Sequence, residues 1–244
     1  MRNNLIAALM VGCLALGLMG QFGGTWLTDT DADDETMKAM GITINTEYGL
    51  HDATVTLTGD NDTLIGMAEA GAAASDADWD DINFADKYEN CTEMLDQART
   101  YATALGMTDD AFDETYEDSI DDCADVGKMA DAGSYGGTTL WIGSALALVA
   151  VLILLASMSG GIEALPDKAD MITQWAAGAL TALAVLLWYM NLPSSGDASA
   201  GMSVYLTVLA AVCGLAAGGM TTFMGGDSAA PEAAAAAEEA PAAE

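Results

Sequence analysis

Four long stretches of this 244-residue chain contain no Asp, Glu, Lys, Arg or His. They occupy residues 5–26, 138–158, 171–192 and 202–224. Each is close to the roughly 20 residues that an α-helix needs to cross the hydrocarbon core of a bilayer. Because a charged side chain is costly in that core, a bilayer requires this separation of apolar and charged sequence. The sequence therefore predicts a mainly α-helical membrane protein with a bundle of four transmembrane helices.

The first of these stretches has competing interpretations. An apolar run after "MRNN" is also typical of a cleaved signal peptide, and "MVGC" at residues 10–13 loosely resembles a lipoprotein box. The run is long for a signal peptide, has no clear small-x-small cleavage site and continues beyond Cys13. These features favour an uncleaved first helix.

Most of the net charge of −31 lies between the first two spans. Residues 27–137 carry 28 Asp and Glu against four basic residues, a net charge of −24. Such self-repulsion opposes compaction at low salt and is screened in molar salt. The composition therefore suggests a halophilic or marine microbe as the source. Nucleic acid is not an expected partner, because no basic patch is available to contact phosphates.

Two positive charges determine the expected orientation, because Lys and Arg in short loops tend to remain in the cytoplasm. Arg2 precedes the first span, and Lys168 lies between the second and third spans. The expected cytoplasmic parts are residues 1–4, 159–170 and 225–244, and the expected extracytoplasmic parts are residues 27–137 and 193–201. The Ala/Glu/Pro-rich tail at 225–244 is expected to be disordered.

Aromatic residues at the span ends agree with this arrangement, since Trp and Tyr are enriched at membrane interfaces. Trp175 marks the inner side. The predicted outer belt consists of Trp26, Trp141, Trp188, Tyr189 and Tyr205.

The first half of the acidic segment has the pattern of a small sheet. Residues 41–45 and 53–59 are short and rich in β-branched side chains, which predicts two strands of a sheet or hairpin. The stretches at 28–36 and 71–81 are rich in Asp and small residues, and are predicted to be loops.

The second half has the period of a helix. Apolar residues recur at steps of three and four from Phe84 to Leu105, and again from Phe112 to Val126. "GMTDD" separates the two stripes, with Thr108 as the predicted N-cap of the second helix. The sequence therefore predicts an antiparallel helical hairpin.

Two cysteines lie on the apolar stripes of this hairpin. Cys91 and Cys123 are each 16 residues from residue 107, the centre of the predicted turn, so they should face each other. A disulfide between them would stabilise the hairpin by roughly 3–4 kcal/mol on the chain-entropy model. It would persist only in an oxidising compartment, in agreement with the outward placement. The alternative is a pair of buried free thiols.

Catalytic motifs are not found. The only histidine, His51, lies in a turn, and no nucleophile elbow, phosphate loop, dinucleotide loop or His-Glu-x-x-His motif is present. We therefore expect no enzyme activity and no cofactor. Two acidic clusters lack the Gly and the bidentate Glu of a calcium loop, so they predict loose binding of diffuse cations without a defined metal site. These clusters are Asp29, Asp31 and Asp33, and Asp76, Asp78 and Asp80.

Other patterns concern modification and packing. Asn61 and Asn90 begin glycosylation acceptor sequences. Small residues four apart let helices approach closely, which favours packing within the bundle, with lateral association between copies as the alternative. The pairs are Ala8/Gly12, Gly20/Gly24 and Gly214/Gly218. Cys13 and Cys213 lie within spans and are expected to act as apolar filling.

The order of parts resembles the claudin-like four-span membrane protein superfamily, in which a helix precedes a long outer segment and three closely spaced helices. The first outer loop of that superfamily carries a small sheet, a Gly-Leu-Trp signature and a disulfide. Here "GITIN", "ATVTLTG" and the intervening "YGLHD" are similar in placement, with His51 where the signature has Trp. The resemblance implies a non-catalytic role in adhesion, membrane organisation or modulation of a partner.

These observations predict a non-enzymatic membrane protein that presents an acidic, disulfide-stabilised outer domain for adhesion, membrane organisation or partner assembly. Its expected contacts are the bilayer and a protein partner or a second copy. The alternative is a transporter or channel component whose outer domain concentrates cations. The spans hold none of the ionisable residues that ion-coupled transporters usually keep there. A subunit of a membrane enzyme would need catalytic groups from another chain.

Overall fold

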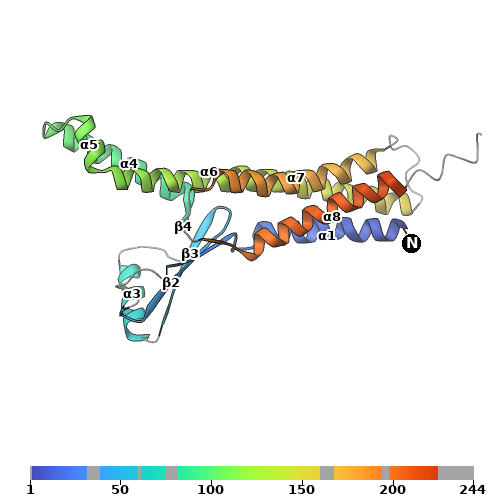
Figure 1. The fold of residues 1–244 in the computed structure, drawn as a ribbon, viewed down its shortest axis with the longest axis horizontal. Helices are drawn as coiled ribbons and strands as arrows, with labels where there is room; N and C mark the ends of the chain where they lie inside the picture. The colour runs from blue at the N-terminus through green and yellow to red at the C-terminus, as the bar shows by residue number, and fades with distance from the viewer. Residues whose placement is uncertain are drawn as a thin grey trace, which may run out of the picture.

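A computed structural model of the chain describes residues 2–31, 39–59, 62–74, 82–159, 168–193 and 198–224. Figure 1 shows a long helical bundle, a small sheet at one of its ends, and a helical projection that continues the bundle beyond that end. The elements in chain order are α1 (Arg2–Phe22), β1 (Leu27–Asp31), β2 (Ile42–Tyr48), β3 (Asp52–Gly59), α3 (Asp62–Ala74), β4 (Ile82–Asn83), α4 (Phe84–Ala104), α5 (Asp109–Thr115), α6 (Glu117–Met158), α7 (Ala169–Asn191), β5 (Ser199–Ala200) and α8 (Met202–Met224).

Four helices are long and apolar enough to cross a membrane, as the sequence predicts. They are α1, α6, α7 and α8, and they indicate a multi-pass membrane protein. Each of these helices packs against two neighbours in the cyclic order α1, α6, α7, α8, so α1 and α7 lie diagonally across the bundle. The N-terminus lies at the end of the bundle opposite the sheet (Figure 1). We call the other end the sheet end.

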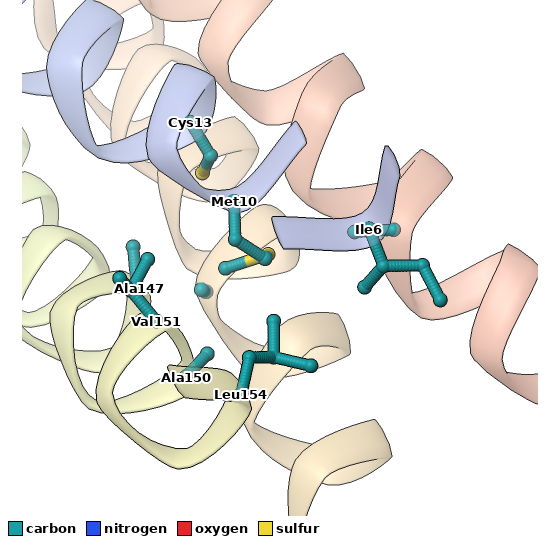
Figure 2. Packing of buried hydrophobic residues seen from close by; sticks show 9 residues of the cluster. Ile6, Met10, Cys13, Ala147, Ala150, Val151 and Leu154 are labelled. Atoms are coloured by element: carbon teal, nitrogen blue, oxygen red, sulfur yellow. The ribbon is translucent and has the colours of Figure 1, made fainter. Parts of the chain in front are cut away.

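The bundle core combines large side chains from α1 with small ones from its neighbours. Ile6, Met10 and Cys13 follow one another at steps of four and three on one face of α1. Figure 2 shows this face directed toward α6, where Ala147, Ala150, Val151 and Leu154 complete the contact. Ala177 and Ala217 bring α7 and α8 into the same cluster.

Helix α6 is continuous over 42 residues, from Glu117 to Met158. At a rise of 1.5 Å per residue it is about 63 Å long, roughly twice the thickness of the hydrocarbon core. The helix therefore continues through residue 138, where the sequence predicts the start of the second span. The second helix of the predicted hairpin and the second span are parts of one helix.

The sheet is antiparallel and five-stranded, in the order β4-β3-β2-β1-β5. The two predicted strands are confirmed, but each is longer than expected, and Tyr48 pairs with Ala53 across a short turn. The loop prediction is wrong for residues 28–31, which belong to β1 and pair with β2. It is also wrong for residues 71–74, which end α3. Backbone pairing overrides the low strand propensity of Asp in β1.

The connection between α7 and α8 contributes the edge strand β5, where the sequence predicts a simple loop. Ala200 pairs with Leu27 and Ser199 pairs with Thr28 of β1. The backbone N–H of Gly201 donates to the Trp26 carbonyl at 2.8 Å. The acidic segment and this short connection therefore lie at the same end of the bundle.

Two of the five predicted belt aromatics are buried in the junction between bundle and sheet. Trp26 is fully buried, its ring N–H donates to the Gly20 carbonyl at 2.8 Å, and its ring meets Trp188 edge-to-face at 4.9 Å. The belt prediction is therefore wrong for these two, because residues of the sheet and of α6 and α7 surround them. The other three are exposed, as the belt requires: Trp141, Tyr189 and Tyr205.

Candidate functional site

A disulfide joins Cys91 of α4 to Cys123 of α6, as predicted, with 5.9 Å between their Cα atoms. Cys123 is buried, whereas most carboxylates of the surrounding stretch 113–127 are exposed. The helical period explains this contrast, since the cysteine faces α4 and the acids occupy the other faces of α6. We call α4, α5 and residues 117–137 of α6 the arm.

The base of the arm is attached to the sheet. The side-chain oxygen of Asn83 caps α4 by accepting from the backbone N–H groups of Ala85 and Asp86, at 2.9 and 3.2 Å. Phe84 is buried, and its backbone N–H donates to the His51 carbonyl at 3.0 Å. The first turn of α4 is therefore fixed to the turn between β2 and β3.

The tip of the arm is a tight reversal between α4 and α5. Gly106 has a φ of +86°, a left-handed conformation that favours glycine, and Met107 N–H donates back to the Ala102 carbonyl at 2.9 Å. The predicted N-cap is confirmed, since the Thr108 hydroxyl accepts from Ala111 N–H at 3.3 Å. The sequence thus specifies both sides of this turn.

A second link closes the arm near its tip. Arg99 of α4 pairs with Asp113 of α5 at 2.6 Å, and its guanidinium lies 5.0 Å from the centroid of the Phe112 ring. Phe112 is buried and stacks on Tyr116 at 4.5 Å. The helix predicted from Phe112 to Val126 is interrupted at Tyr116, the C-cap of α5, so it consists of α5 and the start of α6.

One face of α4 exposes large apolar side chains to solvent. Met94, Tyr101 and Leu105 are 68%, 74% and 88% exposed. Met94 and Tyr101 are seven residues apart and so lie on one side of α4, and Leu105 comes directly after the last residue of that helix. Leu105 was predicted to lie on the buried stripe, but it follows the end of α4 and points outward because the chain reverses at Gly106. We call these three residues the apolar row.

The arm and the sheet meet at two glycines of α6. A side chain at Gly133 would collide with the backbone carbonyl of Leu50, and a Cβ at Gly137 would lie 2.9 Å from Nε2 of His51. His51 is exposed, but its ring rests against α6. The "YGLHD" turn is therefore the contact between sheet and arm.

A cleft of about 410 Å³ lies between the sheet and the arm. Tyr48 and Phe84 line it as a stacked pair with ring centroids 6.3 Å apart. Lys87 and Asp125 carry its charges on the arm side, and Asp29 carries one on the sheet side. The cleft therefore combines apolar walls with charges of both signs.

The predicted cation-binding and modification residues are only partly described. Among the described residues, no group of three or more His, Cys, Asp and Glu is placed to hold a metal ion. Asp29 and Asp31 belong to β1, and Asn90 is exposed in the middle of α4. The other predicted positions lie outside the described residues: Asp33, Asn61, Asp76, Asp78 and Asp80.

Four of the six small residues in the predicted pairs face other helices of the bundle. A Cβ at Gly12 would lie 3.8 Å from the sulfur of Cys213, and one at Gly214 would lie 2.7 Å from Cα of Gly178. A Cβ at Gly218 would meet the Trp175 ring at 2.9 Å, and one at Gly20 would collide with the Thr207 hydroxyl. In contrast, Ala8 is exposed and a Cβ at Gly24 would meet nothing within 4 Å.

Comparison with known proteins provides no further constraint on the site. No protein-family model matches the chain, and no curated protein matches it.

Proposed function

We propose that this protein is a non-enzymatic membrane protein whose acidic, disulfide-stabilised outer domain assembles with a protein partner. The observation that carries the proposal is the apolar row of Met94, Tyr101 and Leu105, exposed on an acidic helix. Large exposed apolar side chains aligned on one helix face are typical of an interaction surface. Solubility alone would favour polar residues at these positions.

Rigidity of the arm supports this role. The disulfide, the Arg99–Asp113 pair and the continuous helix α6 hold the row in one geometry before any partner binds. A preorganised surface loses less conformational entropy on binding, so more of the contact energy contributes to affinity.

Charge indicates what kind of partner fits. The stretch 84–131 carries 14 Asp and Glu against Lys87, Arg99 and Lys128. Two such arms would repel each other, which argues against a second copy as the occupant. The expected partner therefore presents basic residues around an apolar ridge, and its association slows as salt rises.

The proposed placement of the arm outside the cell is supported by the disulfide, which needs an oxidising compartment. Exposed lysines provide the test, because Lys87 and Lys128 lie in the arm and Lys168 precedes α7. A membrane-impermeant amine reagent applied to intact cells should label the two arm lysines, and Lys168 only after lysis. Labelling of Lys168 alone in intact cells would reverse the orientation.

The resemblance to the claudin-like superfamily remains part of this proposal. A small sheet and a disulfide follow the first span, and Leu50 of the "YGLHD" turn is buried against the rest of the protein. These features support adhesion or membrane organisation as the setting in which a partner binds.

A photo-crosslinking experiment tests the proposed surface. A photoreactive residue replaces Tyr101 in the full chain in its native membrane, and a matched control replaces Asp118, which is exposed on α6. We expect one discrete adduct with another protein at position 101 that Met94→Asp abolishes, and none at position 118. Equal adducts at both positions, or no adduct at either, would reject the row as a binding surface.

The transporter alternative draws on the polar residues within the bundle. Thr181 and Thr207 are buried, but their hydroxyls donate to the carbonyls of Ala177 and Ser203 at 2.8 Å within their own helices. Hydroxyls satisfied in this way are ordinary in packed spans. Saturable passage of an ion or solute through vesicles holding the purified protein would favour transport over the assembly role.

A further inference from the structure

An apolar groove of about 660 Å³ runs between α7 and α8 toward the sheet end of the bundle. Its walls are formed by Ala182, Leu186 and Tyr189 of α7 and by Val204, Val208 and Ala211 of α8. None of the described residues that line it is charged. Both helices are candidate membrane spans, so the groove opens at the depth of lipid chains.

The fold itself holds this groove open. Helices α7 and α8 touch closely at Gly178 and Gly214, where a Cβ on Gly178 would lie 2.5 Å from the backbone nitrogen of Leu215. From that contact they diverge toward the sheet end (Figure 1). Between Gly178 and the other end of the bundle the two helices stay in contact, with Gly218 against the Trp175 ring and Thr221 hydrogen-bonded to Gln174. The groove is therefore the space between two helices that separate only toward the sheet end.

Each helix is held apart by a different neighbour. The start of α8 is held against α1, since side chains at Gly20 and Gly23 would collide with Thr207 and Ser203. Pairing of β5 with β1 anchors the same end of α8. The end of α7 is instead held against α6, where a Cβ at Gly136 would lie 2.9 Å from Cβ of Trp188.

We infer that this groove binds one hydrocarbon chain of a membrane lipid with an uncharged or zwitterionic headgroup. A volume of about 660 Å³ lies within the roughly 300–1,000 Å³ of typical small-molecule sites. Water would find almost no hydrogen-bonding partners on these walls, and a lipid chain is the apolar group most available at this depth. The exposed Tyr189 lies at the groove, where an amphipathic ring can meet a lipid headgroup.

The choice of headgroup follows from charge. The segment 27–137 carries a net charge of −24, and no Lys or Arg is found among the described residues that line the groove. An anionic headgroup placed there would be repelled, whereas an uncharged or zwitterionic one would not. This inference concerns the bundle and does not depend on the proposed function of the arm.

The test uses the full chain in vesicles containing phosphatidylcholine with a photoreactive group in one acyl chain. We expect labelling of the groove residues Leu186 and Val208 to exceed labelling of Leu152, which is exposed on α6. Ala182→Phe narrows the groove and should reduce that labelling at least about fivefold, the effect of roughly 1 kcal/mol of lost binding. The matched control Ala145→Phe, on an exposed position of α6, should leave it unchanged.

Four results would overturn the inference. Uniform labelling around the bundle, or labelling insensitive to Ala182→Phe, would mean ordinary boundary lipid only. Equal labelling by an anionic phosphatidylglycerol probe would remove the headgroup preference. Protection of the groove from the probe, together with a crosslinked dimer through α7 or α8, would show that a helix of a second copy occupies it.

Discussion

The arm and the bundle are both helical, but they are held together in opposite ways. The arm leaves most of its surface in water and relies on a few specific links, namely a disulfide, an ion pair and a tight turn. The bundle relies on close backbone approach at glycines, and none of the ion pairs between described residues lies in it. Covalent and polar links therefore take over where the arm is too thin to bury many apolar side chains. Small residues perform the same task where lipid removes the hydrophobic drive between helices.

The largest expected effect is on the bundle, from Gly178→Leu. A side chain here would collide with the backbone of α8, which cannot move aside like a flexible side chain. We expect a loss of more than about 4 kcal/mol, seen as aggregation on size exclusion in detergent or as a large fall in melting temperature. Gly24→Ala is the control, because its Cβ would meet nothing within 4 Å, and it should melt as the wild type does. Equal effects of the two would contradict glycine-mediated packing.

The second effect should be confined to the arm. Cys91→Ser removes the disulfide, which we expect to cost about 3–4 kcal/mol of arm stability. Hydrogen exchange should accelerate in α4 and α5 and stay slow in α1, α7 and α8, because the bundle has its own core. A reducing agent should reproduce this pattern in the wild type and add nothing to the variant. Equal acceleration in both regions would show that they unfold as one unit.

The sequence predicted the parts of both regions that depend on local pattern. Four uncharged stretches became four helices, and two apolar stripes equidistant from a turn placed Cys91 opposite Cys123. Periodicity carries this information because one face of each helix must be buried.

Features that depend on distant contacts could not be predicted in this way. Helix α6 passes through the change from acidic to apolar sequence without a break, because a helix backbone does not depend on the polarity of its side chains. The two-residue strand β5 has no pattern of its own and exists through pairing with β1. Trp26 has the sequence position of a belt residue, and its burial depends on distant residues of the sheet and the bundle, such as Leu50, Leu140 and Trp188. The apolar row could have been found, since Met94 and Tyr101 lie off the predicted buried stripe.

A matched pair of glycines at the junction between arm and sheet should give an intermediate effect. A Cβ at Gly133 would collide with the Leu50 backbone, whereas one at Gly137 would press only on the movable ring of His51 and make an ordinary contact with the Leu50 side chain. We expect Gly133→Ala to destabilise by about 1–3 kcal/mol, as overpacking does. Gly137→Ala should be nearly neutral, because the helix gains about 1 kcal/mol from alanine while the ring shifts. Equal melting temperatures for the two variants would mean that the turn does not pack tightly on α6.

The smallest effect concerns the charged link at the tip. Both partners of the Arg99–Asp113 pair are well exposed, at 41% and 53% of their side chains, so the ion pair itself should contribute less than about 1 kcal/mol. Arg99→Lys keeps the charge but loses the planar group over Phe112, and Arg99→Met loses both. Local hydrogen exchange at the tip should become slightly faster in the Arg99→Lys variant and faster still in the Arg99→Met variant. Raising the salt concentration from about 0.1 to 1 M should reduce the difference in exchange rate between the Arg99→Lys and Arg99→Met variants, because screening weakens the charge interaction.

Higher salt should also stabilise the arm of every variant by weakening repulsion among its carboxylates, while the stability of the bundle should hardly change. A bundle that responded to salt as strongly as the arm would mean that the two regions are not held by different forces.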